Sequence, residues 1–337
     1  MIKGHGDDIY AYNRPITSNF SSNVCYGADL DGLNRHLCNR IRTITNYPEP
    51  EPYTLEKKLE AHHNLPNGTV CVTNGATEAI YLIAQTFRGA NTTILIPTFN
   101  EYADACRIHG HQRTTIREPQ HLPPHTQTAW ICNPNNPTGT VWDKELLTTL
   151  IRSNPKTCFI IDQAYEHFTQ KELLTPQEAL NHHNLIQLHS MTKRYAIPGL
   201  RLGYATAQAG LIQRLRENRM PWSVNRLAIE AGLYITEHGI THTTDLQTLL
   251  AETQKLKKDL ENTQAIDVWP TDTHYMLARL HRGQAKKLKN YLAEEHGTLI
   301  RDASTFEGLS QEYFRIATQS PQENKQLVKH INQWITL

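Results

Sequence analysis

Residues 190–203 read Ser-Met-Thr-Lys-Arg-Tyr-Ala-Ile-Pro-Gly-Leu-Arg-Leu-Gly, and they place Lys193 and Arg201 in one segment with two hydroxyl side chains, those of Ser190 and Thr192. The segment follows a β-rich run at residues 185–189, so it lies at the end of a candidate strand. A lone lysine in such a loop is usually a solvated surface residue. Motifs upstream in the chain change that interpretation, because each also follows a candidate strand.

The middle of the chain alternates short β-rich runs with helical patterns. Residues 76–87 carry apolar side chains at helical spacing, and residues 144–152 form a second such pattern that Asp143 can cap. This alternation predicts a mostly parallel sheet covered by helices, with ligands bound beyond the carboxyl ends of the strands. The candidate strands are residues 69–73, 92–96, 128–132, 157–161, 185–189 and 201–206.

The pattern changes after about residue 220. Pro221 can occupy the first turn of a long helix, and amphipathic helices then alternate with short strand-like runs. The first 45 residues contain no clear long element. The sequence therefore predicts an N-terminal arm at 1–45, a large α/β domain at 46–220, and a linker helix with a smaller α+β domain at 221–337.

Composition excludes several classes of function. A net charge of +1 with 20% charged residues gives no support for a nucleic-acid or anionic-membrane partner. No 18-residue apolar stretch and no secretory signal are visible, so we expect a cytoplasmic protein. The six cysteines contain no CxxC pair and are interpreted as reduced and buried. The eighteen histidines, including pairs at 62–63 and 182–183, are interpreted as surface residues, with no metal site expected.

Asp162 ends the apolar run at residues 158–161, which should be a buried strand. A carboxylate there is costly unless it meets a cation or hydrogen-bond donors. A protonated pyridine nitrogen would satisfy it, and Tyr165 could donate to an oxygen on the same ring. The alternative is that Asp162 caps the next helix.

Two further motifs follow strands. The string Asn-Pro-Asn-Asn-Pro-Thr-Gly at 133–139 can be a turn, but its prolines also suit the rigid presentation of Asn136. Residues 75–77 open a helix, where backbone N–H groups bind phosphate well. Phe99 or Tyr102 could stack on a ring, although an aromatic residue there belongs to the core by default. A phosphate at this place would be held by Gly75, Ala76, Thr77, Ser190, Thr192 and Arg201.

Taken jointly, these motifs resemble those of fold-type I, pyridoxal 5′-phosphate (PLP)-dependent enzymes of the class I/II aminotransferase superfamily, over essentially the whole chain. The resemblance implies a large PLP-binding domain with a seven-stranded-type sheet, a smaller domain and a homodimer with a shared active site. The segments that carry it are Asn74-Gly75-Ala76-Thr77-Glu78, Asn135-Asn136-Pro137-Thr138-Gly139, Asp162-Gln163-Ala164-Tyr165, Ser190-Met191-Thr192-Lys193 and Gly199-Leu200-Arg201-Leu202-Gly203.

The resemblance also implies roles for individual residues. Lys193 would form a Schiff base with the cofactor aldehyde, and Asp162 would meet the pyridine nitrogen. Asn136 and Tyr165 would meet the 3′ oxygen, so Lys193, Asp162 and Tyr165 are the implied catalytic residues. Phe99 completes the implied cofactor contacts, and Tyr47 resembles the tyrosine that reaches the phosphate of the partner subunit's cofactor. Arg315 resembles the arginine that grips a substrate α-carboxylate.

Within the superfamily the chain resembles the branch that holds threonine-phosphate decarboxylases and histidinol-phosphate aminotransferases, which act on small phosphorylated substrates. The start His5-Gly6-Asp7 and the string Phe20-Ser21-Ser22-Asn23 favour the decarboxylases of cobalamin biosynthesis, although Asp7 stands where their start has glycine. An aminotransferase is the second interpretation. The implied substrate contacts are His5, Gly6, Asn23, Asn136, Arg301 and Arg315.

Two other classes of protein, a non-catalytic PLP-binding protein and a hydrolase, account for fewer of these residues. A non-catalytic PLP-binding protein would not need Lys193, Asp162 and Tyr165 together. A hydrolase using Ser190 and Lys193 as a Ser-x-x-Lys pair would leave Asp162, Asn136 and Arg201 without a role.

Overall fold

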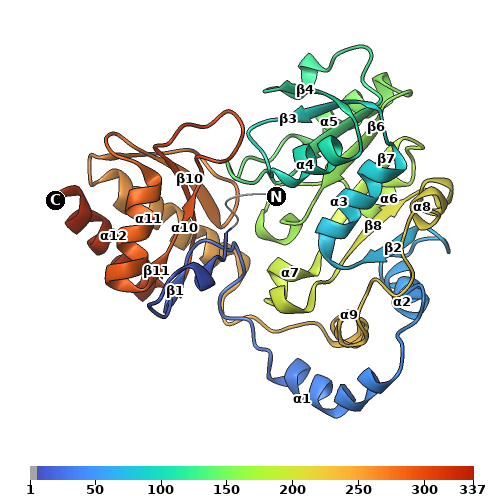
Figure 1. Ribbon diagram of the computed structural model, residues 1–337, viewed down its shortest axis with the longest axis horizontal. Helices are drawn as coiled ribbons and strands as arrows, with labels where there is room; N and C mark the ends of the chain where they lie inside the picture. The colour runs from blue at the N-terminus through green and yellow to red at the C-terminus, as the bar shows by residue number, and fades with distance from the viewer. Residues whose placement is uncertain (1–5) are drawn as a thin grey trace.

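The computed structural model describes residues 6–337, and its largest element is a seven-stranded sheet with strand order β2-β8-β7-β6-β5-β3-β4 (Figure 1). Only β8 runs antiparallel to its neighbours, which confirms the mostly parallel sheet. The strands are β2 (Val70–Thr73), β3 (Asn91–Leu95), β4 (Gln112–Ile116), β5 (Thr128–Cys132), β6 (Cys158–Asp162), β7 (Leu185–Ser190) and β8 (Gly203–Ala207).

Two strand predictions need correction. Edge strand β4 was missed, because its sequence Gln-Arg-Thr-Thr-Ile is largely polar and its first three residues are exposed. The strand expected from residue 201 begins instead at Gly203. Arg201 adopts a left-handed backbone conformation with φ of 57°, which a strand does not allow.

Helices cover both faces of the large sheet. On one face α3 (Gly75–Thr86), α4 (Glu101–Ile108) and α8 (Ala209–Arg216) pack with Trp130 and Ile160. On the other face α5 (Lys144–Ser153) and α6 (Pro176–Ala179) pack with the neighbouring strand residues, including Ile131 and Phe159. Because both faces are covered, the central strands are continuously apolar rather than alternating. They hold the strand ends of the site rigidly.

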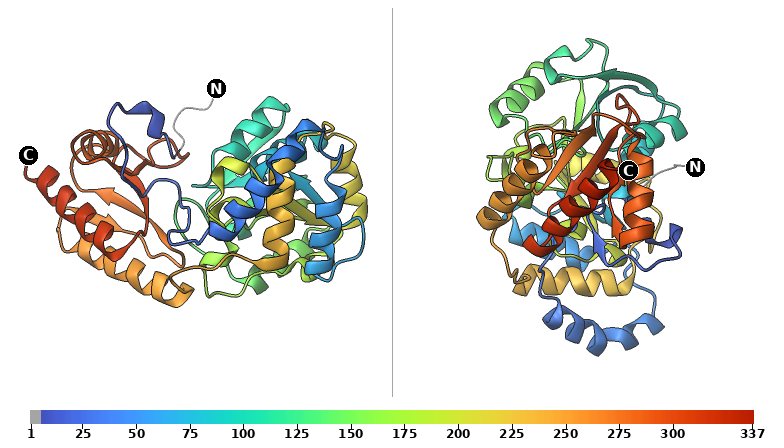
Figure 2. Two further views of the ribbon diagram at one scale, coloured as in Figure 1. Left: turned by 90° about the horizontal axis from the view of Figure 1, so that it is seen from below. Right: turned by 90° about the vertical axis from the view of Figure 1, so that its left-hand side faces the viewer.

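A second, antiparallel sheet forms the smaller domain, with strand order β12-β13-β10-β9 (Figure 2). The short strand β1 (Ser18–Asn19) pairs in parallel with β11 (Thr298–Leu299), so the N-terminal segment is attached to this domain. The remaining elements here are β9 (Ile266–Val268), β10 (Tyr275–Leu280), β12 (Arg301–Asp302), β13 (Tyr313–Ala317), α10 (Leu246–Glu261), α11 (Ala285–His296) and α12 (Pro321–Ile335).

The expectation that the first 45 residues hold no long element is wrong. Helix α1 (Asp31–Arg40) lies beside α9 (Arg226–His238), and only Leu33 on it is buried, so its apolar pattern is weak. Helix α9 packs in one apolar cluster with α2 (Tyr53–His62) and β2 of the large sheet. The domain boundaries at 45 and 220 remain predictions.

Some surface assignments also change. Cys38 on α1 is exposed, whereas the other five cysteines are buried, and all six are free. His182 is buried and His63 is half-buried, so the histidine pairs are not wholly surface residues. Among residues 6–337 no helix has the length and apolar character needed to cross a membrane, and no cluster of three or more potential ligands is arranged to hold a metal.

Candidate active site

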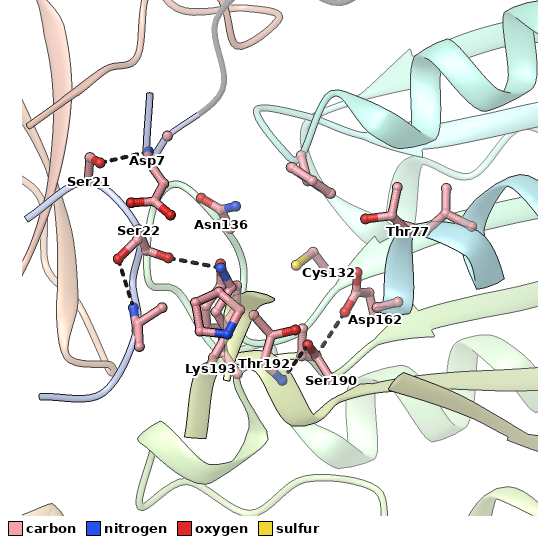
Figure 3. A pocket seen from close by; sticks show the side chains of 18 of the residues that line it. Asp7, Ser21, Ser22, Thr77, Cys132, Asn136, Asp162, Ser190, Thr192 and Lys193 are labelled. Atoms are coloured by element: carbon pink, nitrogen blue, oxygen red, sulfur yellow. Dashed lines mark hydrogen bonds between the residues drawn. The ribbon is translucent and has the colours of Figure 1, made fainter. Parts of the chain in front are cut away.

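A cavity of about 410 Å³ lies where the carboxyl ends of the large sheet face the N-terminal segment and the smaller domain (Figure 3). It brings together most of the residues that the sequence singled out. Those lining it are Gly6, Ala76, Thr77, Phe99, Asn136, Asp162, Tyr165, Ser190, Thr192, Lys193, Arg201 and Arg315.

Lys193 lies on the short helix α7 (Met191–Arg194), which continues directly from β7. Its Nζ donates to the backbone carbonyl of Ser22 at 2.9 Å. Burial, and then the positive charges of Arg315 and Arg201, lower the pKa of Lys193 to about 8, while the carboxylate of Asp7 acts in the opposite direction. About a tenth of this side chain is therefore a free amine at pH 7, far more than for an ordinary lysine, and the free amine is the form that attacks a carbonyl.

Asp162 is buried at the end of β6. Its Oδ2 accepts from the hydroxyl of Tyr102 at 2.6 Å, and its Oδ1 accepts from the backbone N–H of Ala164 at 2.8 Å. Burial raises its pKa, and neither a lysine nor an arginine among residues 6–337 forms an ion pair with it. A cation placed in the cavity beside this carboxylate would offset the cost of burying it.

Arg315 on β13 reaches from the smaller domain toward the motif at 133–139. Its Nη1 donates to Oδ1 of Asn136 at 2.6 Å, and its Nη2 donates to the carbonyl of Ser21. The Nε atom is buried with no hydrogen-bond partner in the described chain. Burial raises the pKa of the nearby Tyr165 to about 12, against the lowering effect of Arg315, so the phenol keeps its proton and can donate.

The residues predicted to hold a phosphate come together at the start of α3. Gly75 begins α3 with φ of +75°, and a Cβ atom built on it would lie 2.5 Å from Nη2 of Arg201. A Cβ on Gly203 would lie 2.6 Å from the backbone nitrogen of Ala76. Only glycine therefore lets the guanidinium and strand β8 approach the start of α3. Ser190 accepts from the N–H of Thr192 at 3.3 Å and caps α7 beside it.

The contacts of Phe99 and Tyr102 indicate which of the two aromatic side chains could stack on a bound ring. Both line the cavity, and their rings meet edge to face with centroids 5.8 Å apart. The hydroxyl of Tyr102 is engaged with Asp162 and its ring is fully buried, whereas Phe99 is half-buried. This arrangement favours Phe99 as the aromatic face available to a bound ring.

Four described residues that the sequence predicted for the site do not line the cavity, namely Asn23, Tyr47, Gly75 and Arg301. Arg301 donates to Oγ1 of Thr305 at 3.1 Å and lies over the ring of Phe306. Asn23 is buried, and its neighbours in sequence, Ser22 and Val24, line the cavity. Tyr47 is 83% exposed. His5 lies outside the described residues. Gly75 contributes through Arg201 rather than by lining the space itself.

Sequence reasoning missed part of the wall. Asp7 has φ of 64°, and its N–H donates to Oγ of Ser21 at 2.8 Å, which brings its carboxylate to the cavity (Figure 3). The sequence includes Asp7 and Ser21 in two of the motif strings, but it does not show that this hydrogen bond, between residues 14 apart in the N-terminal segment, places Asp7 on the wall. The other missed residues are Ser21, Ser22, Val24, Ile80, Cys132, Ala164 and Pro198.

The fold and this site define a PLP-dependent enzyme: residues 17–331 match the family described as aminotransferase class I and II, and the chain belongs to that family. PLP is the cofactor, and the residues fit it. Within residues 6–337 the buried carboxylate of Asp162 has no lysine or arginine partner, and it lines one cavity with Lys193, whose pKa is lowered, and with the start of α3.

Individual proteins of the family show which members this chain is similar to. The chain is 28% identical to a threonine-phosphate decarboxylase from Salmonella typhimurium, over 94% of this chain and 91% of that protein. The crystal structure of L-threonine-O-3-phosphate decarboxylase from Porphyromonas gingivalis superposes with a TM-score of 0.92 at 37% identity, covering 95% of this chain and all of that one. A histidinol-phosphate aminotransferase from Caldanaerobacter subterraneus is 27% identical, over 86% of this chain and 84% of that protein.

Proposed function

We propose that this protein decarboxylates L-threonine O-3-phosphate to (R)-1-aminopropan-2-yl phosphate, a reaction of cobalamin biosynthesis. The observation that carries the proposal is the position of Gly6 on the cavity wall, packed against Ser21 and Arg315. This is the segment whose sequence resembles the substrate-covering arm of the decarboxylases. The similarity to the Salmonella and Porphyromonas enzymes supports the same conclusion.

Each group in the cavity then has a task. When bound, PLP supplies the electron sink for the charge left on the substrate Cα. Asp162 would hold the ring nitrogen, Asn136 and Tyr165 would hold the 3′ oxygen, and the start of α3 would hold the phosphate. Arg315 would bind the substrate α-carboxylate and so orient the substrate for loss of that group. Nζ of Lys193 returns a proton to Cα after carbon dioxide leaves.

The covering segment completes the site by excluding water. The N–H of Asp7 is tied to Ser21, whose carbonyl is held by Arg315, so the arm and the carboxylate-binding arginine are mechanically linked. We propose the remaining predicted contacts, those of His5, Asn23 and Arg301, as substrate contacts made when the arm and the smaller domain close on the ligand. Arg301 lies one strand away from Arg315, opposite it in register, which supports this.

We further propose a cytoplasmic homodimer with a shared active site. The ring of Tyr47 contacts that of Trp222 in a tilted arrangement with centroids 5.4 Å apart, and both rings are exposed in the single chain. Ile41, Ile44 and Met220 are also exposed. A second copy would cover these side chains and bring Tyr47 to the partner subunit's cofactor phosphate.

An aminotransferase acting on histidinol phosphate is the second candidate. The similarity to the Caldanaerobacter aminotransferase favours it, as does Asp7 at a position that is glycine in the start typical of the decarboxylases. The same lysine would then move the Cα proton, and the same cofactor contacts would serve.

The deciding experiment incubates PLP-loaded protein with phosphothreonine and measures carbon dioxide and aminopropanol phosphate. A parallel reaction supplies histidinol phosphate with a keto acid and measures amino transfer. The proposal expects stoichiometric carbon dioxide and aminopropanol phosphate in the first and little product in the second. The reverse result would establish the aminotransferase, and the Lys193→Ala variant serves as the blank for both.

A further inference from the structure

His189 is a buried histidine whose function the site does not yet explain. It is the fifth residue of β7, directly before Ser190, and its side chain is 1% exposed. Its Nδ1 lies 3.0 Å from the carboxylate of Glu166, the residue after Tyr165, and its Nε2 lies 3.1 Å from Oγ1 of Thr206 on β8. The imidazole thus joins the segment that carries Tyr165 to the strand that leads to Lys193.

The hydrogen bonds around His189 determine which atoms carry protons. The amide nitrogen of Gln187 donates to the carbonyl of Leu174 at 2.9 Å and to Oε1 of Gln163 at 2.7 Å. A backbone carbonyl only accepts, so this amide orientation is fixed, and Oε1 of Gln187 must act as the acceptor on its other side. The hydroxyl of Thr206 lies 3.2 Å from that oxygen and donates to it.

Because Thr206 donates its single hydroxyl proton to Gln187, its oxygen can only accept a hydrogen bond from Nε2 of His189. On the other side of the ring, the carboxylate of Glu166 can only accept from Nδ1. Burial would raise the pKa of Glu166, yet the charges of His189 and its neighbours lower it, so this carboxyl is ionised. Both ring nitrogens therefore donate, and the ring is an imidazolium.

We propose that His189 is a positioning residue, an imidazolium that donates to Glu166 and Thr206 and, through Asp162, favours the cofactor with a protonated ring nitrogen. It touches neither cofactor nor substrate in this arrangement. Its cation lies on the strand next to β6, behind the end that carries Asp162. There it favours the ionised carboxylate, which in turn holds the ring proton.

The surroundings agree with a fixed positive charge. Burial raises the pKa of Asp162. The charge of His189 lowers this pKa by more than the charge of Glu166 raises it. Tyr204 stacks on the imidazole with centroids 4.6 Å apart and at 16°, and its hydroxyl meets Nε2 of His63 at 2.8 Å. Burial and then the charge of His189 lower the pKa of His63 to about 4, so that ring stays neutral.

The protonation state is tested on the PLP-loaded protein labelled with ¹⁵N-histidine. At neutral pH we expect one histidine with protons on both nitrogens, absent from the spectrum of His189→Gln. If that variant does not fold, Thr206→Val provides the assignment, because it removes the acceptor at Nε2. A spectrum with no such histidine, or one in which the signal persists in His189→Gln, overturns the proposal.

The positioning role has its own measurement, made with ¹⁵N-labelled PLP. In His189→Gln we expect a smaller protonated fraction of the ring nitrogen and roughly tenfold weaker PLP binding. His182→Gln, which changes another buried histidine outside the cavity wall, should leave both unchanged. Unchanged ring protonation in His189→Gln would overturn the role. The inference rests on the proposed contact between Asp162 and the ring; neither readout uses a substrate, so a wrong substrate assignment would not affect it.

Discussion

The cavity has two walls that are built in different ways. One wall consists of strand ends and helix starts of the large sheet, and it carries Asp162, Lys193 and the phosphate cradle at Gly75. The other wall joins the arm to the smaller domain, where Arg315 contacts the carbonyl of Ser21 across almost the whole chain length. The first wall holds groups that any PLP reaction needs, whereas the second holds groups that orient a substrate. We infer that the sheet wall sets the cofactor chemistry and the arm wall sets the reaction.

The largest expected effect comes from the sheet wall. Among residues 6–337, Lys193 is the one lysine that lines the cavity, so for Lys193→Ala we expect the turnover of any substrate to fall by about 10³-fold or more. Steady-state assays of carbon dioxide release measure this. Lys156→Ala, which alters an exposed lysine, is the matched control. Comparable loss in both variants would contradict the distinction between a catalytic and an ordinary lysine.

A change in the arm wall should spare the cofactor. Arg315→Gln loses the charge that binds a substrate carboxylate, so we expect kcat/KM to fall by about 10- to 100-fold. The affinity for PLP, followed by the absorbance of the bound cofactor, should change little. If instead PLP binding fell as far as kcat/KM, the two walls would not be separable.

The pH dependence of PLP capture connects the two walls. Lys193 reacts as the free amine, so capture by cofactor-free protein should rise with pH around a midpoint near 8. Asp7 raises this pKa, and Asp7→Asn should lower the midpoint and give about threefold faster capture at pH 7. Stopped-flow absorbance provides the rates. A midpoint near that of an ordinary lysine, in either protein, would show that neither wall tunes the amine.

The lowered pKa of Lys193 also makes the free energy of unfolding depend on pH. The folded-state pKa of Lys193 lies below the value of 10.5 for an unperturbed lysine. Between pH 8 and 10.5 the unfolded chain therefore binds more protons than the folded chain. The contribution of Lys193 to stability accordingly rises with pH across this window.

The smallest expected effect concerns the proposed subunit interface. Tyr47→Phe removes one hydroxyl, and the loss of one hydrogen bond to phosphate should weaken PLP binding by about two- to tenfold. Light scattering should report a dimer for both proteins, because the exposed ring is kept. A monomeric protein, or a variant with unchanged PLP affinity, would remove Tyr47 from the site.

The difference between the walls also explains what the sequence could predict. Motifs at 75–77, 133–139 and 162–165 each follow a strand, and a parallel sheet brings such ends together whatever its exact strand order. The cofactor wall was therefore accessible from local patterns. The antiparallel direction of β8 was not, since the sequence of a strand does not state its direction, and the polar edge strand β4 gave no apolar signal.

The arm wall depends on contacts between distant segments. Asp7 reaches the cavity through a left-handed backbone and a hydrogen bond to Ser21, neither of which a motif encodes. Helix α1 escaped prediction because it buries only Leu33, leaving no amphipathic stripe. The charge state inferred for His189 likewise follows from a network that joins two strands, β7 and β8, to the segment after β6.

The central claim is that one amine, that of Lys193, condenses with the aldehyde of PLP. Reduction of PLP-loaded protein with borohydride, followed by peptide mass mapping, tests it most directly. The account predicts a single stable pyridoxyl adduct on the peptide that contains Lys193, and none in Lys193→Ala. An adduct on a different lysine, or no adduct in a protein that still turns over substrate, would contradict it.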